Sequence, residues 1–309
     1  MIANKKNILI TIVGPTAIGK TALSIQLANY FKSDIISCDS RQFFKEMTIG
    51  TAVPDAKELA AAKHHFIQNR SIFDDYNVGA FERDALTKLD ELFQQNKVQI
   101  MVGGSGLYVD AVLKGLDYFP KVDIKIREQL TNQLENEGIE VLQQKLKELD
   151  LETYNTIAIE NPHRLMRALE VCIGSGIPYS TFKNKPKTPR NFASIKIGLT
   201  ADREIIYNRI NQRVDVMIEN GLVEEAKKLH QHKNLNALKT VGYRELFSYF
   251  DEEFTKEFAI SEIKKNTRRF AKRQITWFKR DEKTLWFDYK TDVKDIISKI
   301  SDKINLIHK

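Results

Sequence analysis

The stretch ILITIVGPTAIGKTALSIQLA, residues 8–28, decides the fold of this chain. Its centre, GPTAIGKT at 14–21, fits the phosphate-binding pattern G-x-x-x-x-G-K-[ST], known as a P-loop. β-Branched and apolar residues at 7–13 predict a buried strand before the loop, and leucines at helical spacing predict a helix at 21–31 after it. In this context the match is highly specific. It predicts a phosphate or diphosphate site, but it does not identify a nucleoside triphosphate.

The next segments continue the alternation of strands and helices. Short apolar strands are predicted at 34–37 and 98–102, and an amphipathic helix at 79–95 lies between them. Strands that alternate with helices are typical of a doubly wound parallel sheet. We therefore predict the α/β fold class, with a P-loop-type parallel sheet core flanked by helices.

The pattern changes near Pro120, from which point it is helical and rich in charge. KNKPKTPR at 183–190 has the composition of a linker, and a returning strand is predicted at 194–199. A last strand is predicted at TLWFDY, residues 284–289. We therefore predict an all-helical insertion domain at 120–191, carried on a core that is formed by 1–119 and 192–309, the latter with basic C-terminal helices.

The composition argues against several classes of protein. Two cysteines among 309 residues provide neither a disulfide framework nor a metal-binding spacing, and His64-His65 lacks partners for a metal. No apolar run reaches the roughly 18 residues of a membrane span. The basic and then apolar N-terminus continues into the P-loop without a signal-peptide cleavage pattern. We expect a cytoplasmic protein that does not contact a membrane, and nothing in the sequence demands more than a monomer.

Positive charge is in moderate excess, with 48 Lys and Arg against 41 Asp and Glu. It is densest in KKNTRRFAKRQITWFKR, residues 264–280, where cations recur every four residues beside apolar anchors. Such a segment is either a solvated surface helix with an apolar inner face or a surface for a polyanion. The charge permits a nucleic-acid partner without requiring one.

A P-loop binds phosphate because its glycines let backbone N–H groups converge on phosphate oxygens at a helix N-terminus. Lys20 adds a positive charge, and the Thr21 hydroxyl can be a ligand of Mg²⁺. A P-loop nucleoside triphosphatase also needs an acid at the end of a buried strand. The strand at 98–102 ends instead in Gly103-Gly104-Ser105, which argues against that class.

The acid that we expect beside the P-loop is Asp39, just after the second predicted strand. In an open parallel sheet this position lies at the carboxyl edge, where ligands bind. Asp39 is a candidate general base or an indirect metal ligand, and a helix cap or turn residue is the structural alternative.

Six motifs occur in one order along nearly the whole chain: GPTAIGKT at 14–21, DSRQFF at 39–44, GGSGLY at 103–108, NPHRLMRALEV at 161–171, TVGYRE at 240–245 and RRFAKRQITWFKR at 268–280. Together they resemble the tRNA dimethylallyltransferase family, also called tRNA isopentenyltransferases. The resemblance implies that the P-loop holds the diphosphate of dimethylallyl diphosphate. It also implies that the prenyl group passes to the exocyclic amine of the adenosine immediately 3′ of the anticodon. The implied partner is the tRNA anticodon stem-loop, and the implied cofactor is Mg²⁺.

The resemblance also implies roles for single residues. Asp39 is the implied base, and Thr21 contacts the diphosphate oxygens and the bridging region. Arg213 resembles a family arginine near the diphosphate, with a surface salt bridge as the alternative reading. The implied diphosphate-binding residues are Gly14, Pro15, Thr16, Ala17, Ile18, Gly19, Lys20 and Thr21. The implied tRNA contacts are Asp39, Ser40, Arg41, Gln42, Ser105, Arg127, His163, Arg164, Leu165, Met166, Arg167, Lys239, Thr240, Val241, Gly242, Tyr243 and Arg244.

Three other functions fit part of the sequence. A P-loop small-molecule kinase explains the loop and Asp39 but leaves HRLMR and the basic C-terminal segment without a role. An adenine-nucleotide isopentenyltransferase shares the chemistry, but the helical insertion favours tRNA as the acceptor. A non-catalytic RNA-binding ATPase would need an acid at the end of the strand at 98–102, where this sequence has Gly103-Gly104-Ser105.

Overall fold

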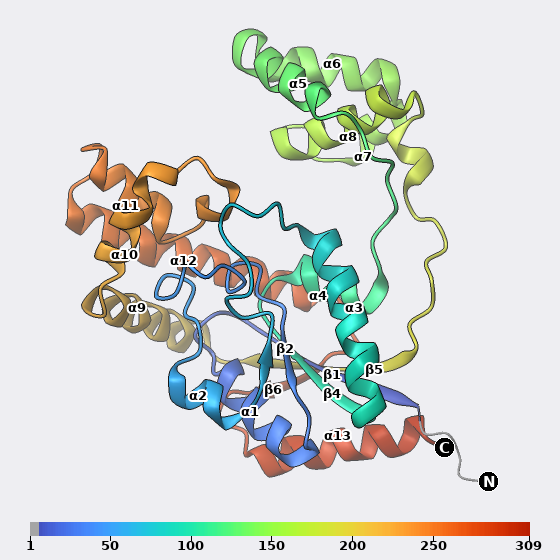
Figure 1. Cartoon of the computed structure of the whole chain (residues 1–309), viewed down its shortest axis with the longest axis vertical. Helices are drawn as coiled ribbons and strands as arrows, with labels where there is room; N and C mark the ends of the chain where they lie inside the picture. The colour runs from blue at the N-terminus through green and yellow to red at the C-terminus, as the bar shows by residue number, and fades with distance from the viewer. Residues whose placement is uncertain (1–5) are drawn as a thin grey trace. The chain divides into compact units, whose positions relative to one another are not determined.

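The computed structural model describes residues 6–309, and it contains a six-stranded sheet (Figure 1). The strand order is β3-β2-β4-β1-β5-β6, and every neighbouring pair is parallel. The strands are β1 (Asn7–Val13), β2 (Ile35–Ser37), β3 (His64–His65), β4 (Val98–Val102), β5 (Phe192–Thr200) and β6 (Leu285–Asp288). The predicted α/β class is confirmed. Because β1 lies between β4 and β5, the P-loop that follows β1 emerges at the middle of the sheet.

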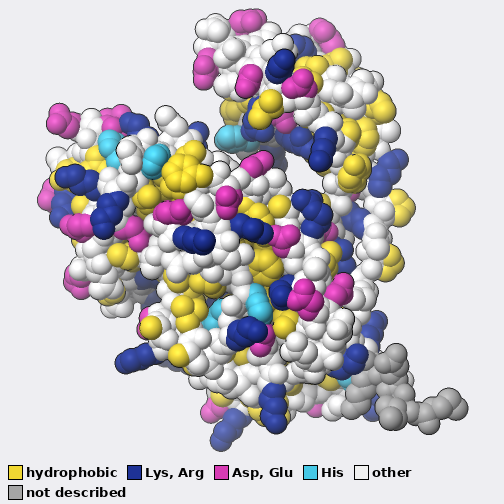
Figure 2. Space-filling view, viewed as in Figure 1, with side chains coloured by type: hydrophobic (Ala, Val, Ile, Leu, Met, Phe, Trp, Pro, Cys, Tyr) yellow, Lys and Arg dark blue, Asp and Glu magenta, His cyan; other side chains and the backbone are white. Residues whose placement is uncertain are grey.

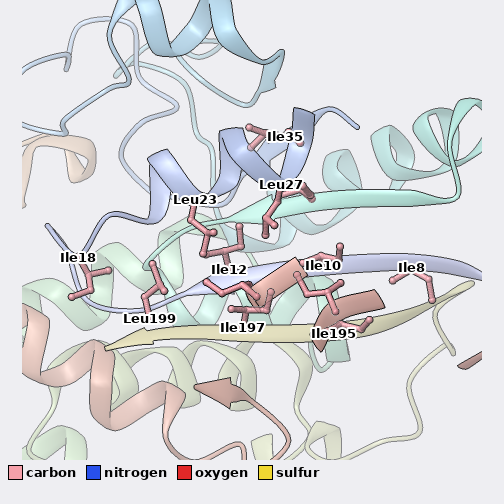
Figure 3. Close-up of a cluster of buried hydrophobic side chains, with 14 of the residues drawn as sticks. Ile8, Ile10, Ile12, Ile18, Leu23, Leu27, Ile35, Ile195, Ile197 and Leu199 are labelled. Atoms are coloured by element: carbon pink, nitrogen blue, oxygen red, sulfur yellow. The ribbon is translucent and has the colours of Figure 1, made fainter. Parts of the chain in front are cut away.

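Helices cover both faces of the sheet because β1 is apolar on both of its faces. Ile8, Ile10 and Ile12 pack in a cluster with residues of α1 (Lys20–Phe31) and α13 (Val293–Ile307), and Figure 3 shows most of this cluster. Leu9 and Val13 point to the other face, where α3 (Val78–Gln95) and α4 (Gly106–Lys114) pack. Such burial on two sides explains the continuous apolar run that predicted the strand.

A helical group follows β5 and packs around Tyr243, Leu246 and Ile263, which are all buried. Its helices are α9 (Arg203–Glu219), α10 (Leu222–Leu229), α11 (Tyr243–Phe250) and α12 (Lys256–Phe278), with short 3₁₀ turns at His230–His232 and Asn236–Leu238. The small helix α2 (Ala56–Ala61) follows β2 and starts at a capping box of Asp55 and Glu58. The basic segment predicted at 264–280 is therefore the second half of α12.

The chain divides into two compact units. Unit 1 contains residues 1–114 and 190–309, and unit 2 contains Gly115–Pro189. Unit 2 has its own core around Leu130, Leu146 and Leu169. Its elements are α5 (Ile124–Glu137), α6 (Ile139–Leu149), α7 (Leu151–Thr156), α8 (Pro162–Ser175) and a 3₁₀ turn at Tyr179–Phe182.

The C-terminal limit of unit 2 has a clear local cause. The Arg190 guanidinium donates to the carbonyl oxygens of Val112 (2.8 Å) and Ala111 (2.7 Å) and pairs with Glu82. These bonds attach Arg190 to α3 and α4 of unit 1, so the chain has returned to the core before 191, the end of the predicted insertion. Within residues 6–309, every helix is too short or too polar to span a bilayer.

The central strand allows a direct test of the packing. Ile10→Ala should lower the free energy of unfolding by about 2–5 kcal/mol and Ile10→Val by about 0.5–1.5 kcal/mol, because each truncation leaves space in a close-packed core. Leu306→Ala, at a side chain that is 63% exposed, is the control and should cost less than about 0.5 kcal/mol. Urea unfolding of the three variants measures these differences. An equal loss of unfolding free energy in Ile10→Ala and Leu306→Ala would contradict the placement of Ile10 in the core.

Candidate active site

The P-loop takes its shape from two glycines with positive φ. Gly14 has φ +146°, and a Cβ there would lie 2.7 Å from the carbonyl oxygen of Leu199 on β5. Gly19 has φ +108° and directly precedes the first residue of α1. A side chain would strain or block both positions. The loop therefore lies tightly against β5 and directs the N-terminal N–H groups of α1 toward one point, as a phosphate site requires.

Two half-buried cations lie beside this loop. Lys20 Nζ donates to the carbonyl oxygen of Pro15 (2.7 Å), and Arg213 Nη1 of α9 donates to Thr16 Oγ1 (3.4 Å). Burial, with repulsion from Arg213, lowers the pKa of Lys20 from 10.5 to about 8, although Asp39 opposes this shift. Burial also lowers the pKa of Arg213. The structure therefore places Arg213 against the P-loop.

Asp39 lies at the carboxyl edge of the sheet, one residue beyond Cys38, which follows β2. Its Oδ1 accepts a hydrogen bond from the backbone N–H of Arg41 (3.0 Å), so the carboxylate also stabilises its own turn. The neighbouring Ser40 is fixed by Ser105, whose Oγ accepts from the Ser40 N–H (3.1 Å) and donates to the Ser40 Oγ (3.1 Å). The loops after β2 and β4 are thus tied together next to the P-loop.

Two cavities meet at these residues. The larger, about 580 Å³, is lined by P-loop residues 16–21 together with Asp39 and Arg213. The smaller, about 260 Å³, has Asp39 and Arg213 in its wall too, together with apolar side chains of α9 and α12. The residues common to both cavities are Thr16, Asp39, Thr51, Ala52 and Arg213. A molecule in one cavity and a molecule in the other would thus share a wall that contains a carboxylate and a guanidinium.

Most of the predicted tRNA contacts of unit 1 gather at the smaller cavity. Its lining includes Ser40, Arg41, Ser105, Thr240, Val241 and Gly242. Gln42 is used differently, because its side-chain amide donates to the carbonyl oxygens of Thr51 (3.2 Å) and Ala52 (2.8 Å) and so fixes the wall between the cavities. Lys239 and Arg244 are exposed.

Tyr243 differs from the expectation for its motif. Its side chain is fully buried, and its hydroxyl donates to Glu225 Oε1 (2.6 Å). The same carboxylate accepts backbone N–H groups of the loop at 48–50. The prediction of a tRNA contact by this side chain is corrected: Tyr243 helps to anchor the loop that carries Thr51 and Ala52.

In unit 2, a buried carboxylate holds two of the predicted tRNA contacts. Glu170 is 3% exposed and pairs with Arg127 of α5 (3.1 Å) and Arg167 of α8 (3.2 Å). Arg167 also lies over the ring of Phe119, 5.5 Å from its centre. The two guanidinium groups are about half exposed and are thereby fixed side by side, in an arrangement suited to phosphate.

The remaining residues of that motif differ in exposure. His163 and Arg164 are exposed at the first turn of α8. Leu165 and Met166 are buried in the core of unit 2, because helical periodicity turns them inward. The expectation that these two side chains contact tRNA is therefore corrected.

The basic helix α12 has three distinct faces. Lys264 pairs with Asp215 (2.5 Å) and Arg268 donates to Asn211 (2.7 Å), so these two cations bind α9. Arg269, Lys272 and Arg273 are exposed. Figure 2 shows acidic side chains interspersed with Lys and Arg over the face in view, so the positive charge does not form one continuous patch there.

The third face of α12 contains a residue that sequence reasoning missed. Gln274 is 5% exposed; its Oε1 accepts from the N–H of Thr16 (2.9 Å), and its Nε2 donates to the carbonyl oxygen of Gly104 (2.9 Å). Arg209 was missed as well, and its Nε donates to the carbonyl oxygen of Ala17 (2.7 Å). A signal for Gln274 does exist in the sequence, because it is a polar residue on the apolar face of an amphipathic helix.

Comparisons with known proteins agree with this geometry. A model of the family described as IPP transferase matches residues 42–281. A protein of Flavobacterium psychrophilum named tRNA dimethylallyltransferase is 64% identical over 304 residues, which covers 96% of this chain and 99% of that protein. A relative from Bacteroides fragilis, tRNA dimethylallyltransferase 1, is 44% identical, and the match covers 96% of this chain and 98% of that protein. The crystal structure of a tRNA isopentenylpyrophosphate transferase from Bacillus halodurans has a TM-score of 0.74 at 34% identity and covers 98% of each chain.

The match to the family extends over most of the chain, and the relatives align from end to end. The candidate residues of the α/β core and of unit 2 therefore belong to one shared architecture. This chain is a member of the IPP transferase family.

Proposed function

We propose that this chain transfers the dimethylallyl group from dimethylallyl diphosphate to the exocyclic amine of the adenosine immediately 3′ of the anticodon in tRNA. The observation that carries the proposal is the wall shared by the two cavities, where the P-loop, Asp39 and Arg213 meet. The relatives named tRNA dimethylallyltransferase support it. We propose that the protein acts as a monomer.

The larger cavity is the proposed site of the diphosphate. Breaking the carbon–oxygen bond of the donor leaves negative charge on the diphosphate and allylic cation character on the prenyl carbon. Lys20, Arg213 and the N–H groups at the start of α1 are placed to stabilise that negative charge. Since they are fixed before the reaction, little reorganisation is needed when charge develops.

The same cavity fits a magnesium ion that is bound mainly through the substrate. Among residues 6–309, no three His, Cys, Asp or Glu side chains form a metal-binding group. Mg²⁺ needs no such group, because it commonly binds substrate phosphates and waters with one or two protein oxygens. We propose that the Thr21 hydroxyl is its direct protein ligand, with Asp39 acting through water. The ion would supply additional positive charge for the leaving diphosphate.

Asp39 is the proposed general base. The adenine amine attacks the prenyl carbon as the diphosphate leaves, and the nitrogen then gives a proton to the carboxylate. Asp39 Oδ1 accepts a hydrogen bond from the N–H of Arg41. Among the described residues Asp39 Oδ2 has no hydrogen-bond partner, so this oxygen is available for the adenine amine. The adenine must leave the anticodon-loop stack to reach this oxygen, and unpaired loop bases cost little to extrude.

The tRNA is proposed to contact three groups of residues. Ser40, Arg41 and Ser105 lie at the cavity that would receive the base. Arg127 and Arg167 in unit 2 would bind the phosphate backbone. The exposed cations of α12 would add attraction that does not depend on sequence.

One assay tests the proposal against its rivals. The protein is incubated with Mg²⁺, an anticodon stem-loop and labelled dimethylallyl diphosphate, and then with AMP in place of RNA, and with labelled ATP in place of the donor. Prenylated RNA is the expected product. Prenylated AMP alone would identify a nucleotide prenyltransferase, and transfer of labelled phosphate would identify a kinase.

Removing the proposed base should slow transfer without affecting donor binding. Asp39→Asn keeps the acceptor for the Arg41 N–H but cannot take a proton, so single-turnover prenyl transfer should fall at least about 100-fold. The dissociation constant for inorganic diphosphate should stay within about threefold. Turnover equal to that of the unsubstituted protein would remove Asp39 from the role of base.

Diphosphate binding should depend on the charge of Lys20. Lys20 is charged below its pKa of about 8 and neutral above it, so affinity for inorganic diphosphate should decrease as the pH rises above this value. The bound anion favours the charged lysine, so the midpoint should lie above the pKa of the free protein. Lys20→Arg stays charged throughout and is the matched control, because both proteins meet the same ionisation of the ligand. Calorimetry measures the affinity at each pH. If the affinities of the two proteins depended on pH in parallel, Lys20 would not be the group whose charge controls diphosphate binding.

The phosphate contact in unit 2 should appear in the salt dependence of RNA binding. Arg127→Gln should reduce the slope of log K against log salt by about one, because one fewer phosphate is neutralised. Lys299→Ala, at an exposed position on α13, is the control and should leave the slope unchanged. Fluorescence anisotropy with a labelled anticodon stem-loop measures both. An unchanged slope in Arg127→Gln would exclude Arg127 from the interface.

A further inference from the structure

One face of α12 runs along the site from end to end. Ile263, Thr267 and Phe270 line the smaller cavity, Gln274 contacts the P-loop, and the ring of Trp277 lies against α4. These positions recur at intervals of three and four residues, as one face of a helix requires. The helix is therefore part of the wall of the site as well as a carrier of surface charge.

Gln274 joins three segments that are distant in sequence. Its acceptor bond to the Thr16 N–H spans 258 residues, and its donor bond to the Gly104 carbonyl oxygen spans 170 residues. Both bonds are 2.9 Å long, and the side chain is buried. A carboxamide is uncharged, donates through its nitrogen and accepts through its oxygen. The position thus uses both functions of the amide.

The contact leaves no room for adjustment. A Cβ on Gly104 would lie 2.1 Å from Gln274 Nε2, so the loop after β4 needs glycine for the amide to approach. Trp277 is fixed in a similar way one turn later, because its Nε1 donates to Asp110 Oδ2 (2.9 Å). A Cβ on Gly106 would lie 2.4 Å from the Trp277 ring. Gly104 and Gly106 of GGSGLY therefore serve the docking of α12.

Thr16, the P-loop residue that Gln274 binds, lies where the two cavities meet. Thr16 lines both cavities, and its hydroxyl accepts from Arg213. Among the described residues, Thr16 is the only member of the P-loop that belongs to both linings. A shift of Thr16 would therefore move the wall that the two cavities share.

We propose that Gln274 is a positioning residue that fixes Thr16, and with it the shared wall beside which the prenyl carbon would meet the adenine amine. This inference rests on the proposed function. Gln274 touches neither substrate in it. Losing its two bonds would let the P-loop shift relative to the loop after β4 while Lys20 and the start of α1 still bind diphosphate.

The first test separates transfer from binding. Gln274→Met keeps the length of the side chain and removes both bonds, so kcat should fall about 10- to 100-fold, the scale expected for a small misplacement of reacting groups. KM for dimethylallyl diphosphate and the dissociation constant for inorganic diphosphate should change less than about threefold. Thr276→Ala, exposed on the same helix, is the matched control with unchanged kcat.

The second test uses pH to identify the donor bond. In Gln274→Glu, only the protonated carboxyl can both accept from the Thr16 N–H and donate to the Gly104 carbonyl oxygen. Its kcat relative to the unsubstituted protein should therefore decrease as pH rises, whereas Gln274→Met should give a constant ratio. Taking the ratio cancels the titration of Lys20, which both proteins share. A side chain that only fills space would show no such pH dependence.

A third variant approaches the contact from the other side. Gly104→Ala should displace the amide and give the same fall in kcat as Gln274→Met, and the double variant should be no slower than either one. Unchanged kcat in folded Gln274→Met or in Gly104→Ala, or a fall equal in kcat and in diphosphate affinity, would overturn the inference. Absence of prenyl transfer by the unsubstituted protein would instead refute the proposed function.

Discussion

Two half-buried cations beside the P-loop, Lys20 and Arg213, favour an anion in this site. Burial disfavours the charge of each, and the two repel each other, as the lowered pKa of Lys20 shows. Asp39 offsets this repulsion only in part. A polyanion in the larger cavity would relieve the repulsion and satisfy the N–H groups at the start of α1. Without a ligand, burial and mutual repulsion disfavour the charged forms of these side chains. A bound polyanion would favour the charged forms.

The sheet makes this arrangement possible. β1 lies at the centre of the sheet and is packed on both faces, so the loop at its end has a rigid base. Asp39 follows β2, which is separated from β1 by β4 in the sheet. The loop after β4 therefore lies between the P-loop and the loop that contains Asp39. Parallel strands bring all three loops to the same edge. Helix α9 then adds Arg213 to the wall, and Gln274 of α12 holds Thr16 from behind it.

The local features could be predicted from the sequence. The apolar run of β1, the glycines of the P-loop and the helical spacing after it are properties of adjacent residues, and Asp39 was found because strand ends share an edge. Gln274 could not be assigned, because its partners lie 258 and 170 residues away and only the fold brings them together. The two segments at 163–167 and 239–244 predicted tRNA contacts that include Leu165, Met166 and Tyr243. Burial of these three side chains shows that some motif residues support the site by packing. The end of the insertion depended on bonds of Arg190 to α4, which no local pattern indicates.

The most direct test is a crystal structure of the protein with an anticodon stem-loop and an analogue of dimethylallyl diphosphate in which sulfur replaces the bridging oxygen. The account predicts the diphosphate in the larger cavity, in contact with Lys20 and the N–H groups at the start of α1. It also predicts an extruded adenine in the smaller cavity, with its amine within hydrogen-bond reach, about 3 Å, of Asp39. A diphosphate bound elsewhere, or an adenine whose amine lies far from Asp39, would contradict the account.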